Sequence, residues 1–260
     1  MLEQPGPDLD LCRRYVALRP PPGRLLMCGV TGSHHYGFSS ADSDIDLKGI
    51  HQLPTERIVS LFPGRDNHDA LEVFEDVECD LTTNELAQAL RLLIKGNGNL
   101  HERLASPFQL VTNQLVDELR ELGLRARSRA SHGHYRGYLH GMRREHEKQE
   151  PPRAKSLLYT YRVALTGIHL LETGELVAHL PSLAPEYGFS EVLELVEVKI
   201  AGAEKEPAPE PLATQLRARW PELEARIDAA RDRSPLPEQA TNVDEIEAWL
   251  VARRREGFGA

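Results

Sequence analysis

Hydrophobic and polar positions follow two different patterns along the chain, and the change falls near residue 107. Before that residue, short apolar runs lie between turn residues. The run "RLLMCGV" at 24–30 is typical of a buried strand, and "DIDLKGI" at 44–50 alternates polar and apolar side chains, as a strand packed on one side does. The stretch "ALEVFEDVECDLTT" at 70–83 gives further strand signal. These patterns predict a small β-sheet in the front half.

The front half also contains two predicted helices. Residues 9–18 form a short helical candidate that ends at "RPPPG", because proline lacks an amide donor and restricts the residue before it. Thr82 and Glu85 have the spacing of a capping box, which predicts a helix from about Thr83 to Lys95. This prediction puts Asp80 near the end of the preceding strand.

After residue 107 the periodicity of hydrophobic positions is almost entirely helical. The predicted helices cover residues 109–130, 132–149, 154–173, 189–203, 212–230 and 243–255, with breaks at the proline-rich segments 203–211 and 233–242. The segregation of strands from helices predicts an α+β fold. We expect a small mixed β-sheet core with helices on one face in residues 1–107, followed by a helical domain in residues 108–260.

Composition narrows the class of protein. The chain has 260 residues, of which 40% are hydrophobic and 27% charged, so it can bury a sizeable core and is not disordered. No uncharged run approaches the length of a membrane span, and the start of the chain lacks the features of a signal sequence, so we expect a cytoplasmic protein without membrane partners. The cysteines Cys12, Cys28 and Cys79 lie outside any CxxC pattern and are expected to be reduced and structural.

The charge is distributed unevenly. The net charge is −9, which argues against nonspecific binding of nucleic acid by the whole surface. Residues 120–162 nevertheless contain eleven Lys and Arg against four Asp and Glu. This segment, with "HGHYRGYLHGMRREHEK" at 132–148, is either a solvated helix face or a surface for an anionic partner such as RNA.

The clearest chemical signal is a pair of aspartates. Asp44 and Asp46 alternate with apolar residues, so both carboxylates project from one face of the predicted strand, within about 7 Å of each other. Two carboxylates so close repel each other unless a cation lies between them. Oxygen ligands favour Mg²⁺ or Mn²⁺, and Mg²⁺ is usually held by one or two carboxylates together with substrate phosphates. The pair therefore predicts a metal site that works on phosphates.

A turn ahead of the strand supplies a partner for such phosphates. In "TGS" at 31–33, Gly32 lets the backbone approach an oxyanion, and the hydroxyl of Ser33 and the amides that follow can donate to it. A third carboxylate would complete a two-metal site, in which one ion activates the attacking hydroxyl and the other stabilises the leaving pyrophosphate. Asp80 is the first candidate and Glu78 the second, with Asp76 less favoured.

These residues resemble the signature of the DNA polymerase β-like nucleotidyltransferase superfamily, which is a small-residue pair, a spacer and an Asp-x-Asp strand. The longer segment "GSHHYGFSSADSDIDLKGI" resembles in particular that of the bacterial nucleotidyltransferases of the YcgL/RlaP type, an RNA-ligase-associated group. Such proteins carry a later strand with an Asp, then a "KGNxN" segment and an acidic residue. Here these are Asp80, "KGNGNLHERLASP" at 95–107 and Glu102.

The resemblance implies transfer of a nucleoside monophosphate from a nucleoside triphosphate, expected to be ATP, to a hydroxyl, with Mg²⁺ as cofactor. It also implies that Lys155 and Arg162, seven residues apart on one predicted helix, contact the triphosphate. The acceptor stays open between an RNA end, a protein hydroxyl and a small molecule, and the oligomeric state is equally open.

Two alternatives compete with this interpretation. His34 and His35, which depart from the residues usual in related turns, could bind a softer metal together with Asp44 in a hydrolase. Alternatively, the chain is a catalytically weak component of an RNA-repair or stress operon that binds a nucleotide or RNA without transferring a nucleotide.

Overall fold

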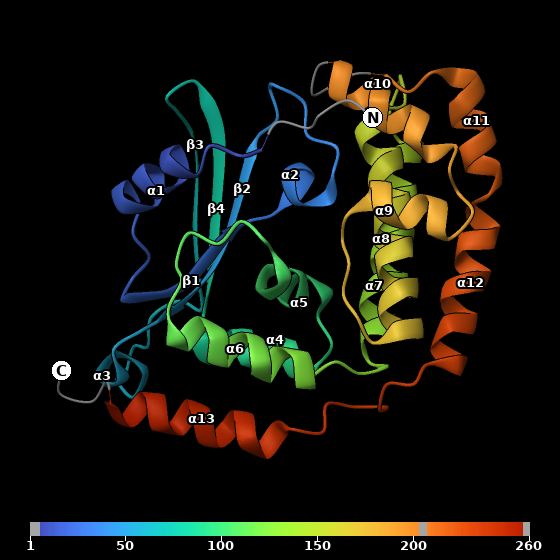
Figure 1. Ribbon diagram of the computed structural model, residues 1–260. Helices are drawn as coiled ribbons and strands as arrows, with labels where there is room; N and C mark the ends of the chain where they lie inside the picture. The colour runs from blue at the N-terminus through green and yellow to red at the C-terminus, as the bar shows by residue number, and fades with distance from the viewer. Residues whose placement is uncertain (1–5, 203–206, 257–260) are drawn as a thin grey trace. The chain divides into compact units, whose positions relative to one another are not determined.

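The computed structural model describes residues 6–202 and 207–256, and Figure 1 traces the chain. The chain divides into two compact units, each built from separate segments of the sequence. Of the described residues, the sheet unit comprises 7–32, 44–127 and 239–256. The helical unit comprises 33–43, 128–202 and 207–238, together with residue 6.

A four-stranded mixed sheet forms the centre of the sheet unit (Figure 1). Its strands are β1 (Arg24–Val30), β2 (Ile45–Gln52), β3 (Asn67–Phe74) and β4 (Val77–Glu85), in the order β1-β2-β4-β3. Strands β2 and β4 are parallel, whereas β1 and β3 pair antiparallel with them at the two edges. The predicted α+β class with a small mixed sheet is confirmed.

Helices cover both faces of this sheet. The sheet unit contains α1 (Leu9–Leu18), α3 (Thr55–Ile58), α4 (Leu86–Ile94), α5 (Gly98–Ala105), α6 (Gln114–Arg125) and α13 (Val243–Glu256). Helix α1 packs through Tyr15 in a cluster with Leu47, whereas α4 to α6 pack in another cluster with Ile50. Because Leu47 and Ile50 are three residues apart on one strand, they point to opposite faces. We expected helices on one face of the sheet; α4 to α6 cover one face, and α1 covers the other.

The predicted start of the helix after β4 was wrong. We expected this helix to begin near Thr83, but β4 continues to Glu85 and α4 begins at Leu86. The reason is that β4 pairs with β2 as far as His51, while the carboxylate of Glu85 itself accepts a hydrogen bond from the amide of Ala87 at 2.8 Å. Asp80 consequently lies in the middle of a strand and not near its end.

Six helices make up most of the helical unit: α7 (Ser131–Glu147), α8 (Ala154–Thr173), α9 (Leu180–Glu186), α10 (Val192–Ala201), α11 (Glu210–Ala218) and α12 (Trp220–Arg233). Helix α8 has the predicted bounds and is buried along almost its whole length, so the other helices pack around it. The helix expected over 212–230 is interrupted, because Pro221 starts a new helix at α12. Helix α9 was not predicted.

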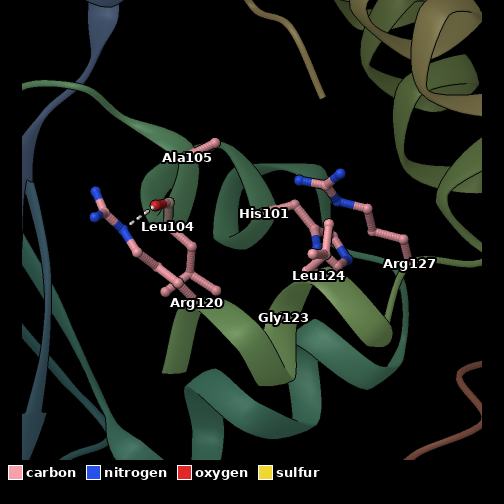
Figure 2. A pocket seen from close by; sticks show the side chains of 7 residues that line it. All are labelled: His101, Leu104, Ala105, Arg120, Gly123, Leu124 and Arg127. Atoms are coloured by element: carbon pink, nitrogen blue, oxygen red, sulfur yellow. Dashed lines mark hydrogen bonds between the residues drawn. The ribbon is translucent and has the colours of Figure 1, made fainter. Parts of the chain in front are cut away.

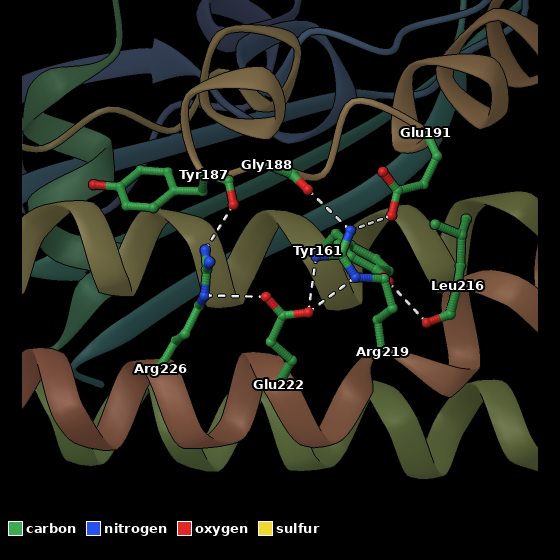
Figure 3. Close-up of polar contacts among 8 residues, drawn as sticks. All are labelled: Tyr161, Tyr187, Gly188, Glu191, Leu216, Arg219, Glu222 and Arg226. Atoms are coloured by element: carbon green, nitrogen blue, oxygen red, sulfur yellow. Dashed lines mark hydrogen bonds and ion pairs between the residues drawn. The ribbon is translucent and has the colours of Figure 1, made fainter.

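A network of arginines ties α12 to the segment between α9 and α10 within the helical unit (Figure 3). Arg219 pairs with Glu191 and with Glu222, and it donates to the carbonyl of Gly188 at 2.9 Å. Arg226 donates to the carbonyl of Tyr187 at 2.6 Å and also pairs with Glu222. These contacts hold the segment between α9 and α10 against α12.

The domain boundary expected at residue 107 stays a prediction, although the two compact units divide the chain differently. Helices α6 and α13 come from the part expected to form the helical domain, yet both belong to the sheet unit. The predicted linker at 203–211 lies partly outside the described residues. Within the part of the chain that the structure describes, no helix is long and apolar enough to cross a membrane.

Candidate functional site

Two of the three predicted carboxylates are direct neighbours in the sheet. Asp46 on β2 and Asp80 on β4 are register partners of parallel strands, so their side chains leave the same face one strand apart. The side chain of Asp46 is 22% exposed and that of Asp80 is 38% exposed. Asp44 comes immediately before β2 and two residues before Asp46. The strand register therefore brings together the carboxylates that the sequence analysis selected 34 residues apart.

The other acidic candidates lie farther toward the β3–β4 turn. Glu78 is exposed and is the register partner of Val73, whereas the register partner of Asp80 on β3 is Leu71. Asp76 lies in the turn itself with a positive φ of 66°. Of these acidic residues, only Asp80 is the register partner of Asp46, so the register favours Asp80 as the third carboxylate.

A lysine lies between the two partnered aspartates. The Nζ of Lys48 is 2.7 Å from Oδ2 of Asp80 and 4.0 Å from Oδ1 of Asp46. It also donates to Oγ1 of Thr82 at 3.3 Å. In the sequence, Lys48 is only one polar position of the predicted strand, although a period of two already puts it on the face of Asp46.

The glycine of the predicted turn lies directly against the second aspartate. Gly32 has a φ of +64°, and a Cβ added to it would lie 1.9 Å from Oδ2 of Asp46. The amide of Thr31 donates to the carbonyl of Asp46 at 2.8 Å, which holds the turn against β2. Only glycine fits this position, because any side chain would overlap the carboxylate.

The residues that follow form the five-residue helix α2 (Gly32–Tyr36). The carbonyl of Ser33 accepts hydrogen bonds from the amides of Gly37 and Phe38, both at 3.1 Å. Ser33 is 1% exposed and His35 is 8% exposed, with the imidazole of His35 stacked on Tyr36 at 5.5 Å between ring centroids. His35 thus packs within α2, and this contact lends no support to the softer-metal alternative.

Arg162 contacts the tyrosine that ends α2. Its side chain is fully buried in the helical unit, with the guanidinium carbon 3.9 Å from the ring centroid of Tyr36 and 5.6 Å from those of Tyr138 and Tyr159. A desolvated guanidinium stacked on aromatic rings stabilises the structure around it. These contacts indicate that Arg162 positions α2. Lys155 lies in the first turn of α8 and is half-buried, and the predicted phosphate contacts of both residues stay predictions.

A second buried cation, absent from the sequence analysis, fixes the segment between α2 and β2. Lys199 of α10 is fully buried and donates to Oγ of Ser40 at 2.6 Å, while Ser40 donates to Oδ1 of Asp42 at 2.8 Å. Lys199 and Ser40 are 159 residues apart in the sequence. No local pattern could have predicted this contact.

Three of the eleven basic residues in the 120–162 segment form ion pairs within the helical unit. Arg136 and Arg143 of α7 both pair with Glu224 of α12, and Arg136 also pairs with Asp228. Arg129 pairs with Glu238 at 3.7 Å. These ion pairs show that part of the charge is engaged within the fold, and the two interpretations of the segment, a solvated helix face or a surface for an anionic partner such as RNA, both stay predictions.

The cysteines are inert. All three are buried in the cluster under α1, and none forms a disulfide. Burial raises the pKa of Cys12 and Cys28 to about 12 and that of Cys79 to about 11, so the thiolate is scarce at neutral pH. The predicted structural role agrees with this environment.

A small hollow lies between α5 and α6 in the sheet unit (Figure 2). Its volume is about 260 Å³, and it is lined by His101, Leu104, Ala105, Arg120, Gly123, Leu124 and Arg127. Arg120 is engaged in structure, because it donates to the carbonyl of Leu104 at 3.0 Å. The hollow is smaller than the roughly 300–1,000 Å³ of pockets that enclose drug-sized ligands.

Comparison with known proteins agrees with this geometry. Residues 16–252 match the sequence profile of RlaP, described as the RNA repair pathway DNA polymerase beta family. The chain is also 26% identical over 223 residues to the uncharacterized protein MJ0002 of Methanocaldococcus jannaschii, an alignment that covers 84% of this chain and 89% of that protein. The motif residues described above all lie within the matched region.

Proposed function

The chain belongs to the RlaP family of polymerase β-like nucleotidyltransferases, and we propose that it transfers a nucleoside monophosphate from a nucleoside triphosphate to a hydroxyl, releasing pyrophosphate. The observation that carries this proposal is the pairing of Asp46 with Asp80, with the backbone of Gly32 against Asp46. ATP is the proposed donor, and Mg²⁺ or Mn²⁺ the proposed cofactor. The description of the family names an RNA repair pathway, so we propose an RNA hydroxyl as the first acceptor to test.

The residues present fit a divalent cation that arrives together with its nucleotide. Asp46 and Asp80 offer hard oxygen ligands from adjacent strands, and Asp44 is close to them in sequence. Among residues 6–202 and 207–256, no group of three or more His, Cys, Asp or Glu side chains is arranged to hold a metal ion. This fits a site that phosphate oxygens complete, because Mg²⁺ commonly takes one or two carboxylates and fills its other positions with phosphates and water.

Each residue has a distinct part in the proposed reaction. Asp44 and Asp46 would hold the cation, and Asp80 would complete its site on the acceptor side. When bound, the cation would polarise the phosphoryl oxygens and lower the pKa of the attacking hydroxyl. Asp80 would accept the proton of that hydroxyl. The new bond joins the acceptor oxygen to the α-phosphorus, and the bond from the α-phosphorus to the bridging oxygen breaks, so that pyrophosphate leaves with the electron pair. Gly32 and Ser33 would donate to the triphosphate.

The test is pyrophosphate release from each of the four nucleoside triphosphates with Mg²⁺ and candidate RNA acceptors. We expect the double variant Asp44→Asn, Asp46→Asn to lose this release while its circular dichroism spectrum stays that of the wild type. Undiminished release by the double variant would contradict the proposal. Nucleotide binding without any transfer would instead favour the alternative of a catalytically weak binding component.

A further inference from the structure

We propose that Lys48 is the internal counter-ion of the paired carboxylates, and that a divalent cation has to displace its ammonium group in order to bind. The inference rests on the proposed function and deepens it, because it assigns to Lys48 the control of metal binding. Neither the family match nor the sequence motif assigns a role to this lysine.

The ammonium group of Lys48 lies close to both carboxylates of the pair. Lys48 lies two residues after Asp46 on β2, so both side chains leave the same face of the sheet. Its Nζ lies 2.7 Å from Asp80 and 4.0 Å from Asp46, and thus contacts one carboxylate closely while it faces the other. A metal ion shared by these carboxylates would need the same space.

The charge of Lys48 reduces the repulsion between the two carboxylates. Register partners on adjacent strands are separated by about 4.8 Å, so the carboxylates of Asp46 and Asp80 repel each other unless a positive charge compensates them. The side chain of Lys48 is only 22% exposed, so its charge is less screened than that of a surface lysine. The ammonium group therefore stabilises the metal-free pair and opposes the entry of a second cation.

The ammonium group of Lys48 needs a new partner when a cation displaces it. A lysine side chain is a flexible four-carbon stem with a compact charge, so it can leave the pair without moving the strand. A cation that arrives alone offers the displaced ammonium group no new partner, whereas a cation that arrives with a triphosphate brings anionic oxygens. We therefore expect weak binding of the metal by itself in the wild-type protein.

The experiment measures the binding of Mn²⁺ alone to the full chain by electron paramagnetic resonance of the free ion. Replacement Lys48→Met removes the competing charge and keeps the length of the stem. We expect the Kd for Mn²⁺ to fall about tenfold, which corresponds to the loss of one partly screened competing ion pair. The control is Arg19→Met, which removes the ion pair between Arg19 and Glu72 at 2.7 Å in the same unit and should leave the Kd unchanged.

Equal or weaker Mn²⁺ binding by Lys48→Met would overturn the inference, provided that the wild type binds the ion. Lys48→Gln serves as a second variant with the same expectation if Lys48→Met does not fold. Binding that persists in Asp46→Asn, Asp80→Asn would also overturn it, because the ion would then lie elsewhere. The proposed function itself would be contradicted if neither the wild type nor the two lysine variants bound Mn²⁺, with or without nucleotide.

Discussion

The Cα of Gly32 lies against the carboxylate of Asp46, so closely that a Cβ at Gly32 would come within 1.9 Å of Oδ2 and 2.8 Å of Cγ. The turn and the strand are thereby parts of one arrangement, joined by a direct contact and by the hydrogen bond from Thr31 to the carbonyl of Asp46. This contact explains why a glycine stands in the motif fourteen residues ahead of the aspartate that it touches.

Replacement Gly32→Ala should abolish most of the activity. The added methyl group would push Asp46 aside, and the φ of +64° is strained for alanine. Since a displacement of about 1 Å in a catalytic group can cost about 100-fold, we expect a loss of that order in pyrophosphate release. The matched control is Gly133→Ala on α7, where an added Cβ meets nothing within 4 Å. An active Gly32→Ala variant would show that the contact does not position Asp46.

Replacement Arg162→Met should lower both stability and affinity for the nucleotide. The guanidinium over Tyr36 is fully buried, so its removal is expected to cost about 2 kcal/mol of unfolding free energy. Because Tyr36 ends the short helix that begins at Gly32, we expect KM for the nucleotide to rise more than kcat falls. Denaturant unfolding and steady-state kinetics measure the two effects.

The control for this prediction is another cation–π pair of the same unit. Arg143 lies 4.8 Å from the ring centroid of Trp220, and neither residue belongs to α2. Replacement Arg143→Lys should reduce stability and leave KM unchanged. If both variants raise KM alike, the effect reflects a general loss of stability and Arg162 does not act through Tyr36.

The ion pair between Glu85 and Arg254 should contribute strongly to the stability of the sheet unit. The carboxylate of Glu85 is 4% exposed, caps α4, and accepts from Arg254 of α13 at 2.5 Å. Replacement Arg254→Met leaves that charge buried without its partner, and we expect a loss of about 3 kcal/mol in urea unfolding. Glu256→Gln breaks the exposed pair with Arg253 on the same helix and should cost less than about 0.5 kcal/mol. Equal losses of unfolding free energy in the two variants would show that the burial of Glu85 does not determine the cost.

Stability should fall as the pH drops below neutrality because of His51. Burial lowers the pKa of this imidazole from 6.5, and its Nδ1 lies 2.8 Å from Oγ1 of Thr83. Below pH 6.5 the unfolded chain therefore takes up a proton that the folded chain does not, so the free energy of unfolding decreases until the folded pKa is reached. Melting curves between pH 7.5 and 5.5 measure this loss (about 1.4 kcal/mol per pH unit at most for one group).

Replacement His51→Gln should make that pH dependence shallower. Burial also lowers the pKa of His146 and His179, so part of the dependence is expected to persist. An unaltered slope in His51→Gln would mean that His51 does not contribute to the loss.

The strands and the aspartate motif could be predicted because their signals are local. The alternation around Asp46 and the apolar run before the turn both survive in the structure as β2 and β1. The start of α4 could not be predicted, because pairing of β4 with β2 overrides the local capping signal at Thr82. The contact of Lys199 with Ser40 depends on packing across 159 residues, and the short α9 has too few residues for a periodic pattern.

The candidate site was predicted in part for the same reason. Strand periodicity put Asp44 and Asp46 on one face, but the neighbour of Asp46 across the sheet depends on the register between β2 and β4. That register singles out Asp80 from the nearby acidic residues. It also reveals Lys48, whose position between the carboxylates is visible only when both strands are present.

In the proposed reaction a nucleoside monophosphate is transferred, and no other part of the nucleotide. The decisive experiment is incubation with ATP labelled at the α-phosphate or at the γ-phosphate, with Mg²⁺ and an RNA acceptor. We predict that the α-label becomes bound to the acceptor, that the γ-label is recovered as pyrophosphate, and that Asp44→Asn, Asp46→Asn yields neither product. Transfer of the γ-label to the acceptor, or undiminished transfer by the double variant, would contradict the account.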